Sequence, residues 1–171
     1  TMIGDTNTYK FDLYSLDVVN ANVVYCAGKS GTVLKTIDGS TFTKLSYNFD
    51  GDMTASDETR DDLDGGIAFF DENRGVVAVD FNKEATIWWT EDGGTNWHPV
   101  KIAAAFPPGV TSYRVYDVAV GGDSTVALAC YHRVCLVSTN GGRTFANKGV
   151  VQFANVYTSY VEVFDNNTII Y

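Results

Sequence analysis

The sequence predicts an all-β fold assembled from repeated four-stranded units, and three observations support this prediction. Aromatic and β-branched residues are plentiful, 16 glycines suit many tight turns, and no long stretch has the periodicity of an amphipathic helix. One turn motif occurs three times, as TIDGSTF (36–42), TEDGGTNW (90–97) and STNGGRTF (138–145). The same order of apolar strands and polar turns precedes each copy, which is the mark of a repeat architecture.

Each copy is expected to contain four antiparallel strands. AGKSGTVLKT (27–36) aligns without a gap with ACYHRVCLVS (129–138), and GGIAFFDENRGVVAV begins the middle copy. The turns VNAN, DENRG and GGDS would connect the first strand of each copy to the second. The copies recur about every 50 residues, which is in the range of β-propeller blades with their connections. A β-sandwich with coincidentally similar turns is the alternative.

The repeats divide the chain into about three and a half blades. The first blade is expected at about 10–49, the second at 65–102, the third at 114–150 and the start of a fourth at 156–171, with an acidic inter-blade loop at 50–64. Three and a half blades cannot close a ring, since propellers usually contain four to eight. The sequence therefore predicts a segment of a larger six- to eight-bladed propeller, completed by the remainder of its own chain.

The three motif turns have a structural explanation. The Asp or Asn side chain can accept hydrogen bonds from backbone N–H groups of its own turn, the glycines can take positive φ angles, and the aromatic residue can pack back over the hairpin. The alternative is a catalytic or metal-binding carboxylate at Asp92, but three copies of the turn favour a role in folding. The predicted structural residues are Asp38, Asp92, Gly94, Trp97, Asn140, Gly142 and Phe145.

These turns resemble the Asp-box, or bacterial neuraminidase repeat, whose pattern is Ser/Thr-x-Asp-x-Gly-x-Thr-Trp/Phe. The second copy has Asn96 in place of Thr, the third has Asn140 in place of Asp, and the first is one residue short. Asp-box repeats occur in sialidases, xyloglucan-cleaving glycosidases, sortilin-type receptors and the photosystem II assembly-factor family. The blade GGIAFFDENRGVVAV is most similar to the assembly-factor-like and sortilin-like repeat proteins.

The resemblance implies a non-catalytic binding or assembly scaffold that presents variable loops on one face to a protein or glycan partner. The alternative is a glycoside hydrolase, sialidase-like or xyloglucanase-like, whose catalytic residues lie mostly outside this segment. None of the arginines lies in the Arg-Ile-Pro context of sialidases. We therefore assign no catalytic residue and favour binding over catalysis.

Charge narrows the range of partners and cofactors. The net charge of −9 and the scattered basic residues argue against nucleic acid, and no apolar run is long enough to insert into a membrane. The acidic loop 50–64 is expected to be a solvated loop, a docking site for a basic partner, or a structural calcium site, because oxygen ligands at close spacing suit Ca²⁺. The calcium candidates are Asp50, Asp52, Asp61, Asp62 and Asp64, and no other cofactor is expected.

Strand parity predicts which face binds the partner. In a four-stranded meander, the turns after the first and third strands lie on one face, and the remaining connections lie on the other. These remaining connections differ in length between copies, and variable loops carry recognition more often than constant turns. The candidate binding residues on this loop face are Phe81, Tyr131, His132, Arg133, Asp61, Asp62 and Asp64.

Two further features bear on the cellular compartment. Cys130 and Cys135 flank a short connection and are expected to lie opposite one another. A cross-strand disulfide and two free thiols are the two alternatives that the sequence leaves open. Asn166–Thr168 is an Asn-x-Thr glycosylation sequon. Together they favour an extracellular or secretory and lumenal location over a cytoplasmic one.

Overall fold

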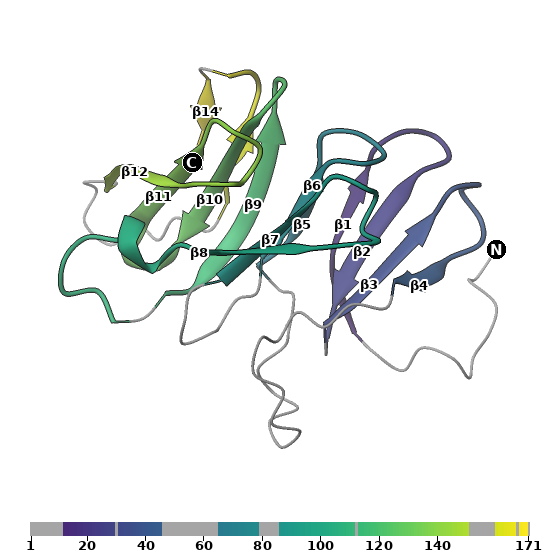
Figure 1. Cartoon of the computed structure of the whole chain (residues 1–171), viewed down its shortest axis with the longest axis horizontal. Helices are drawn as coiled ribbons and strands as arrows, with labels where there is room; N and C mark the ends of the chain where they lie inside the picture. Colours follow the sequence, from purple (N-terminus) through teal and green to yellow (C-terminus); the bar gives the residue numbers. More distant parts are fainter. Residues whose placement is uncertain are drawn as a thin grey trace.

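The fold is all-β and consists of sheets that follow one another along the chain. The computed structural model describes residues 12–29, 31–45, 65–78, 86–111, 113–150, 160–166 and 168–170. Three four-stranded antiparallel sheets and one two-stranded sheet are formed, each with its strands in sequence order. They stand side by side like propeller blades (Figure 1), which confirms the predicted fold class.

The strands occupy short, regularly spaced segments. The first sheet contains β1 (Leu13–Val18), β2 (Val24–Gly28), β3 (Thr32–Thr36) and β4 (Thr43–Leu45). The second contains β5 (Ile67–Phe69), β6 (Gly75–Ala78), β7 (Thr86–Thr90) and β8 (His98–Lys101). The third contains β9 (Val115–Gly121), β10 (Thr125–Cys130), β11 (Val134–Ser138) and β12 (Ala146–Val150), and the last contains β13 (Glu162–Val163) and β14 (Ile169–Ile170). Two 3₁₀ turns are η1 (Ala103–Ala105), after β8, and η2 (Tyr131–Arg133), between β10 and β11.

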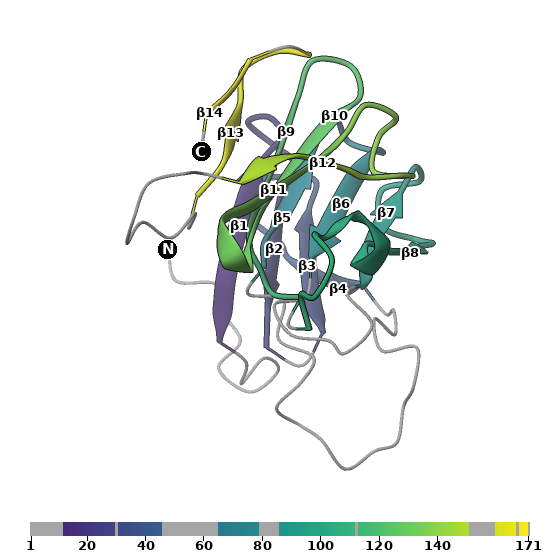
Figure 2. The same cartoon turned by 90° about the vertical axis from the view of Figure 1, so that its left-hand side faces the viewer.

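The sheets pack face to face. The first strands β1, β5, β9 and β13 contact one another in this order, and a view turned by 90° shows the sheets stacked one behind another (Figure 2). Strand β10 shows that a middle sheet is covered on both faces, because all six of its residues are buried. Successive side chains point to opposite faces of a strand. Val126 and Leu128 enter the core between the second and third sheets, while Ala127 and Ala129 enter the core beside the last sheet.

Side chains of one sheet also hold the first strand of the next. Asp17 Oδ2 accepts a hydrogen bond from Phe69 N at 2.6 Å, and Asp117 Oδ2 accepts one from Val161 N at 2.9 Å. Burial raises the pKa of both carboxyl groups, although these backbone hydrogen bonds act in the opposite direction. The equivalent bonds in two places show that the inter-sheet joint repeats along with the sheets.

The structure corrects the expectation that Cys130 and Cys135 lie opposite one another, and of the two alternatives it has the free thiols rather than the disulfide. Both cysteines are free, and the register pairs Cys130 with Val134 and Cys135 with Ala129. The two thiols therefore point to opposite faces of the sheet, since neighbouring residues of a strand alternate. Burial raises the pKa of both thiols, that of Cys135 to about 11, so both are protonated and unreactive at neutral pH.

Candidate binding site

The second motif turn, between β7 and β8, is closed by its own side chains. Thr90 Oγ1 donates to Asp92 Oδ1 at 2.9 Å and accepts from Gly94 N at 3.0 Å. Asp92 Oδ1 also accepts from Asn96 N at 2.8 Å, and Asp92 Oδ2 accepts from the Asn96 side-chain amide at 2.7 Å. These bonds satisfy backbone N–H groups that a tight turn would otherwise leave without partners.

The third turn, between β11 and β12, has the same geometry without a carboxylate. Ser138 Oγ donates to Asn140 Oδ1 at 2.8 Å and accepts from Gly142 N at 2.9 Å, while Thr144 N donates to Asn140 Oδ1 at 3.0 Å. What the two turns share is therefore an oxygen acceptor at this position, and this geometry does not require a charge. In the shorter first turn, Asp38 Oδ1 accepts instead from Ser40 N at 2.8 Å and Thr41 N at 2.7 Å.

All three motif turns lie on one face, which we call the turn face. Each donates a hydrogen bond from its first glycine to the turn between the first two strands of the same sheet. The three bonds are Gly39 N to Asn22 O, Gly93 N to Asn73 O and Gly141 N to Ser124 O, at 2.8–2.9 Å. The motif turns also reach the preceding sheet. Trp97 is buried in the core between the first two sheets, where its ring meets that of Phe69 edge-on.

The pKa of Asp92 leads to a test of the turn. Burial opposes ionisation, but the hydrogen bonds from the backbone and side chain of Asn96 and from Thr90 outweigh it and lower the pKa below its ordinary value of 3.8. A carboxyl group with a lowered pKa in the folded state stabilises the fold above its unfolded pKa, and this contribution is lost as the pH falls through the folded pKa. We expect the D92N/N96T variant, which reproduces the residue pair of the third turn, to lose less stability on acidification than the wild type.

The measurement is urea unfolding of both proteins at a series of pH values from about 7 down to about 2. A matched control is the Asp123→Asn variant, which removes one carboxylate from a neighbouring turn on the same face. Identical pH dependence of the wild type and D92N/N96T would show that the carboxylate of Asp92 is not stabilised by its turn.

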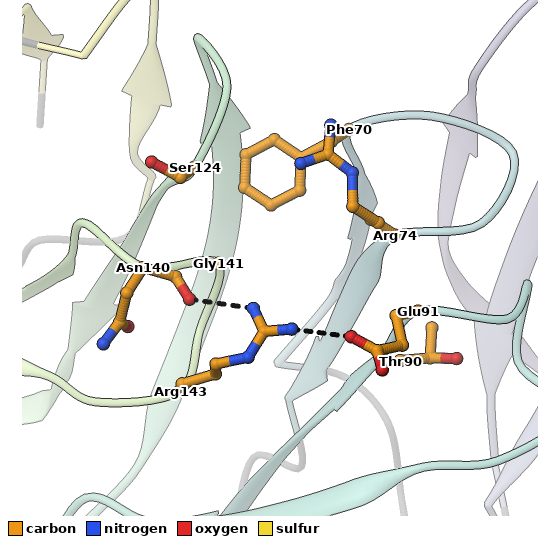
Figure 3. A pocket seen from close by; sticks show the side chains of 8 residues that line it. All are labelled: Phe70, Arg74, Thr90, Glu91, Ser124, Asn140, Gly141 and Arg143. Carbon is orange, nitrogen blue, oxygen red and sulfur yellow. Dashed lines mark hydrogen bonds and ion pairs between the residues drawn. The ribbon is translucent and has the colours of Figure 1, made fainter.

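A pocket of about 290 Å³ opens on the turn face between the second and third sheets. Four turns contribute to it, one after the first strand and one after the third strand of each sheet. Figure 3 shows the lining residues on both sides of the space between the two sheets, with the Arg143 guanidinium reaching toward Glu91. The lining residues are Phe70, Arg74, Thr90, Glu91, Ser124, Asn140, Gly141 and Arg143.

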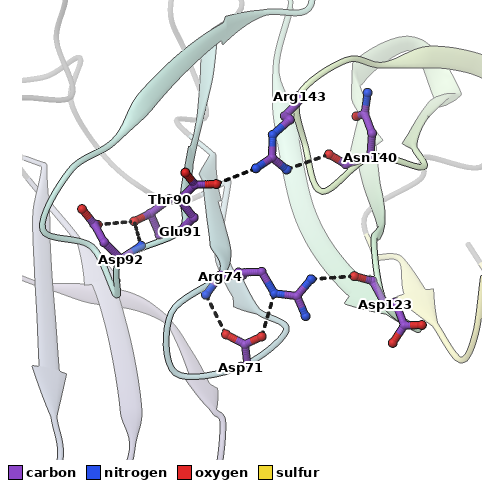
Figure 4. A network of polar contacts seen from close by, with 8 residues as sticks. All are labelled: Asp71, Arg74, Thr90, Glu91, Asp92, Asp123, Asn140 and Arg143. Atoms are coloured by element: carbon purple, nitrogen blue, oxygen red, sulfur yellow. Dashed lines mark hydrogen bonds and ion pairs between the residues drawn. The ribbon is translucent and has the colours of Figure 1, made fainter.

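Both arginines of this pocket are held in place by contacts across the two sheets (Figure 4). Arg143 Nη2 pairs with Glu91 Oε2 at 2.7 Å, and its Nη1 donates to Asn140 O at 3.1 Å. The Arg143 guanidinium also lies 4.0 Å from the centre of the Trp89 ring, which is within the range of a cation–π contact. Its position is thus fixed on three sides.

Arg74 mirrors this arrangement from the second sheet. Its Nε pairs with Asp71 Oδ2 at 2.7 Å, its Nη1 donates to Asp123 O at 2.9 Å, and its guanidinium lies 5.5 Å from the centre of the Phe70 ring. Sequence analysis treated the basic residues as scattered and missed this pocket. The signal was present, however, since Arg74 and Arg143 lie in turns that strand parity assigns to the same face.

On the opposite loop face, η2 brings Tyr131, His132 and Arg133 together. His132 and Arg133 have φ angles of 60° and 63°, and Val134 N donates to Tyr131 O. Two consecutive positive φ angles closed by this bond are typical of a type I′ turn. The His132 side chain is exposed, and the Tyr131 ring lies 4.2 Å from the His132 ring and 6.3 Å from the Tyr116 ring.

The other sequence-predicted site residues lie outside the described residues. These are Phe81 of the loop face and the acidic-loop residues Asp50, Asp52, Asp61, Asp62 and Asp64. Among the residues that the structure describes, no group of three or more His, Cys, Asp and Glu side chains is arranged to hold a metal ion. Within the same residues, no helix is long and apolar enough to cross a membrane.

Comparison with known proteins finds similarity in structure alone. No family model matches the sequence, and no curated protein matches it. The structure of YCF48 bound to a D1 peptide matches with a TM-score of 0.59 and 12% identity over 82% of this chain. YCF48 from Cyanidioschyzon merolae matches with a TM-score of 0.57 and 18% identity over 81%. The GH74 xyloglucanase from Xanthomonas campestris matches with a TM-score of 0.52 and 16% identity over 87%.

These similarities establish the fold. The chain spans 45%, 37% and 25% of the three matched chains, respectively. The matched proteins include a peptide complex and a glycoside hydrolase, and one fold can carry unrelated functions. The chain is therefore similar to part of a β-propeller scaffold, and its function has to be argued from its own residues.

Proposed function

We propose that this chain is part of a propeller that binds a protein partner through its loop face, centred on Tyr131, His132 and Arg133. The observation that carries this proposal is the left-handed backbone of His132 and Arg133. A residue with a Cβ atom loses about 1–2 kcal/mol in this conformation, and tight hairpins normally place Asn-Gly there. Backbone strain of this kind is concentrated at functional sites.

The side chains of this turn suit a protein surface better than an enzymatic role. Tyrosine and arginine are enriched at the centres of protein interfaces. Tyr116 and Tyr131 are half-buried and lie edge to face, so binding would cost them little conformational entropy. The fold likeness to YCF48, solved with a bound D1 peptide, is consistent with a propeller that binds a peptide segment.

The test replaces the strained pair by the residues that the turn prefers. We expect H132N/R133G to raise the free energy of unfolding by about 1–2 kcal/mol, because Asn and Gly accept positive φ angles. The same variant should lose binding to peptides selected by phage display against the wild-type chain. Stability is measured by urea unfolding and affinity by fluorescence anisotropy of the labelled peptides.

A control variant on the turn face tests whether the peptides bind to the loop face alone. Glu91→Gln changes the charge of the opposite face and should leave the affinity for these peptides unchanged. The proposal fails if H132N/R133G binds the peptides as tightly as the wild type, or if Glu91→Gln abolishes their binding. A fall in stability of H132N/R133G would show that His132 and Arg133 make contacts that outweigh their strain.

A further inference from the structure

A pocket on the turn face, between the second and third sheets, lies apart from the turn Tyr131–Arg133. We propose that it binds a neutral, hydroxyl-rich ligand of the size of one or two sugar units. The pocket lies on the face opposite to Tyr131–Arg133 and draws on different residues, so this proposal does not depend on the proposed function. Phe70, Arg74, Glu91, Ser124 and Arg143 carry the argument.

The pocket presents hydrogen-bond donors and acceptors together. Within the described part of the chain, neither Arg74 Nη2 nor Arg143 Nε donates a hydrogen bond, and Glu91 Oε1 accepts none. Ser124 Oγ donates to Thr139 O at 3.0 Å and keeps its lone pairs to accept a bond. A hydroxyl group donates and accepts at once. Adjacent hydroxyl groups of a sugar can therefore pair with a guanidinium and a carboxylate of the same pocket.

The charge of the pocket selects against ionic ligands. The two guanidinium groups are balanced by the carboxylates of Asp71 and Glu91, each in an ion pair at 2.7 Å. An anion would have to compete with these carboxylates in a chain whose net charge is −9, and a cation would have to compete with the arginines. A neutral ligand leaves both ion pairs intact and still gains hydrogen bonds to charged groups, which are the stronger kind.

The shape and rigidity of the pocket fit the same class of ligand. The half-buried Phe70 ring provides an apolar surface for the C–H face of a sugar ring, beside polar groups for its hydroxyls (Figure 3). The volume of about 290 Å³ lies at the lower end for small-molecule pockets. Both arginines are held before any ligand arrives, through Asp123 O, Asn140 O and the Trp89 ring. This preorganisation reduces the entropy lost on binding.

The experiment is an NMR titration of the whole chain with methyl glucoside, cellobiose, xylobiose and N-acetylglucosamine, and separately with sodium sulfate as the anionic probe. We expect at least one sugar to shift the Gly141 and Arg143 N–H signals saturably, while sulfate at the same concentration leaves them unchanged. No saturable shift with any of the four sugars overturns the proposal. A saturable shift with sulfate alone shows an anion site and overturns it as well.

The Glu91→Gln variant distinguishes the two kinds of ligand by the sign of the change. Loss of the carboxylate removes a charged acceptor, so sugar affinity should fall about tenfold. The affinity of the pocket for sulfate should instead rise, because Arg143 loses its counter-charge. Glu162→Gln, an equal charge change on β13, should alter neither affinity. Sugar affinity that is unchanged in Glu91→Gln contradicts the assignment.

A second variant keeps the test decisive if Glu91→Gln does not fold. Phe70→Leu removes the aromatic ring while keeping an apolar side chain, and circular dichroism checks that the sheets persist. We expect this variant to lose at least about tenfold in sugar affinity. Retention of full sugar affinity in folded Phe70→Leu would place the binding outside the pocket.

Discussion

Gly142→Ala is expected to lower the free energy of unfolding by about 2–4 kcal/mol, from backbone strain and overpacking together. Gly142 has a φ of +88°, and a Cβ atom there would lie 2.7 Å from Val76 Cγ1 and 3.5 Å from Trp89 Cβ. Val76 and Trp89 belong to the preceding sheet and are packed in the core between the two sheets. The methyl group would therefore push the third sheet away from the second.

Gly109 provides a control with the same φ angle. Its φ is also +88°, but nothing lies within 4 Å of the position of a Cβ atom. Gly109→Ala should therefore cost only the strain of the left-handed backbone, about 1 kcal/mol. Urea unfolding of both variants separates strain from overpacking. Equal losses in the two variants would show that the motif turn does not press on the preceding sheet.

The second glycine of the motif has one role that the sequence predicts and one that it does not. The sequence explains Gly94 and Gly142 by their positive φ angles, because this requirement is local to the turn. It does not show that each glycine also faces the preceding sheet, where a Cβ atom at Gly94 would meet Leu45 and one at Gly142 would meet Val76. These two contacts join residues that are 49 and 66 positions apart in the chain, and one sequence carries no signal for them.

The repeated strands, in contrast, were predictable because the features that define them are local in the sequence. Alternation of apolar residues, turn chemistry and the order of strands are all local properties, and they recur in every copy. The register of β10 against β11 was not predictable to one residue, and that single residue decides whether Cys130 and Cys135 share a face. Pairing Cys130 with Cys135 would leave four residues between them, whereas in the structure Cys130 pairs with Val134 and the three residues of η2 lie between them.

The candidate site was only partly accessible from the sequence. The placement of Tyr131, His132 and Arg133 in a connection of the loop face was predictable, because strand parity depends on the order of the strands alone. The left-handed backbone of His132 and Arg133 could not be foreseen, because arginine does not favour positive φ angles and histidine, although enriched there, adopts them in only a minority of cases. The pocket on the turn face was missed because Arg74 and Arg143 become neighbours only when the second and third sheets pack together.

Tyr25→Ala is expected to have a similarly large effect at the first inter-sheet joint. The Tyr25 side chain is fully buried, and its ring stacks on that of Phe69 with 3.6 Å between centroids and 5° between planes. Its hydroxyl donates to Glu72 O at 2.9 Å and lies 3.3 Å from Gly93 O, both in turns of the second sheet. Truncation of a buried aromatic side chain costs about 3–5 kcal/mol.

Tyr25→Phe divides this loss into its two parts. The ring and its stacking on Phe69 remain, so only the hydroxyl contacts to the second sheet are lost, at a cost of about 1–2 kcal/mol. Hydrogen exchange then shows which strands lose stability. In Tyr25→Ala, amides of β2 and β3 should exchange faster relative to those of β10 and β11, because Tyr25 joins only the first and second sheets. Equal acceleration in the first and third sheets would mean that the sheets unfold as one cooperative unit, and that no single joint can be weakened alone.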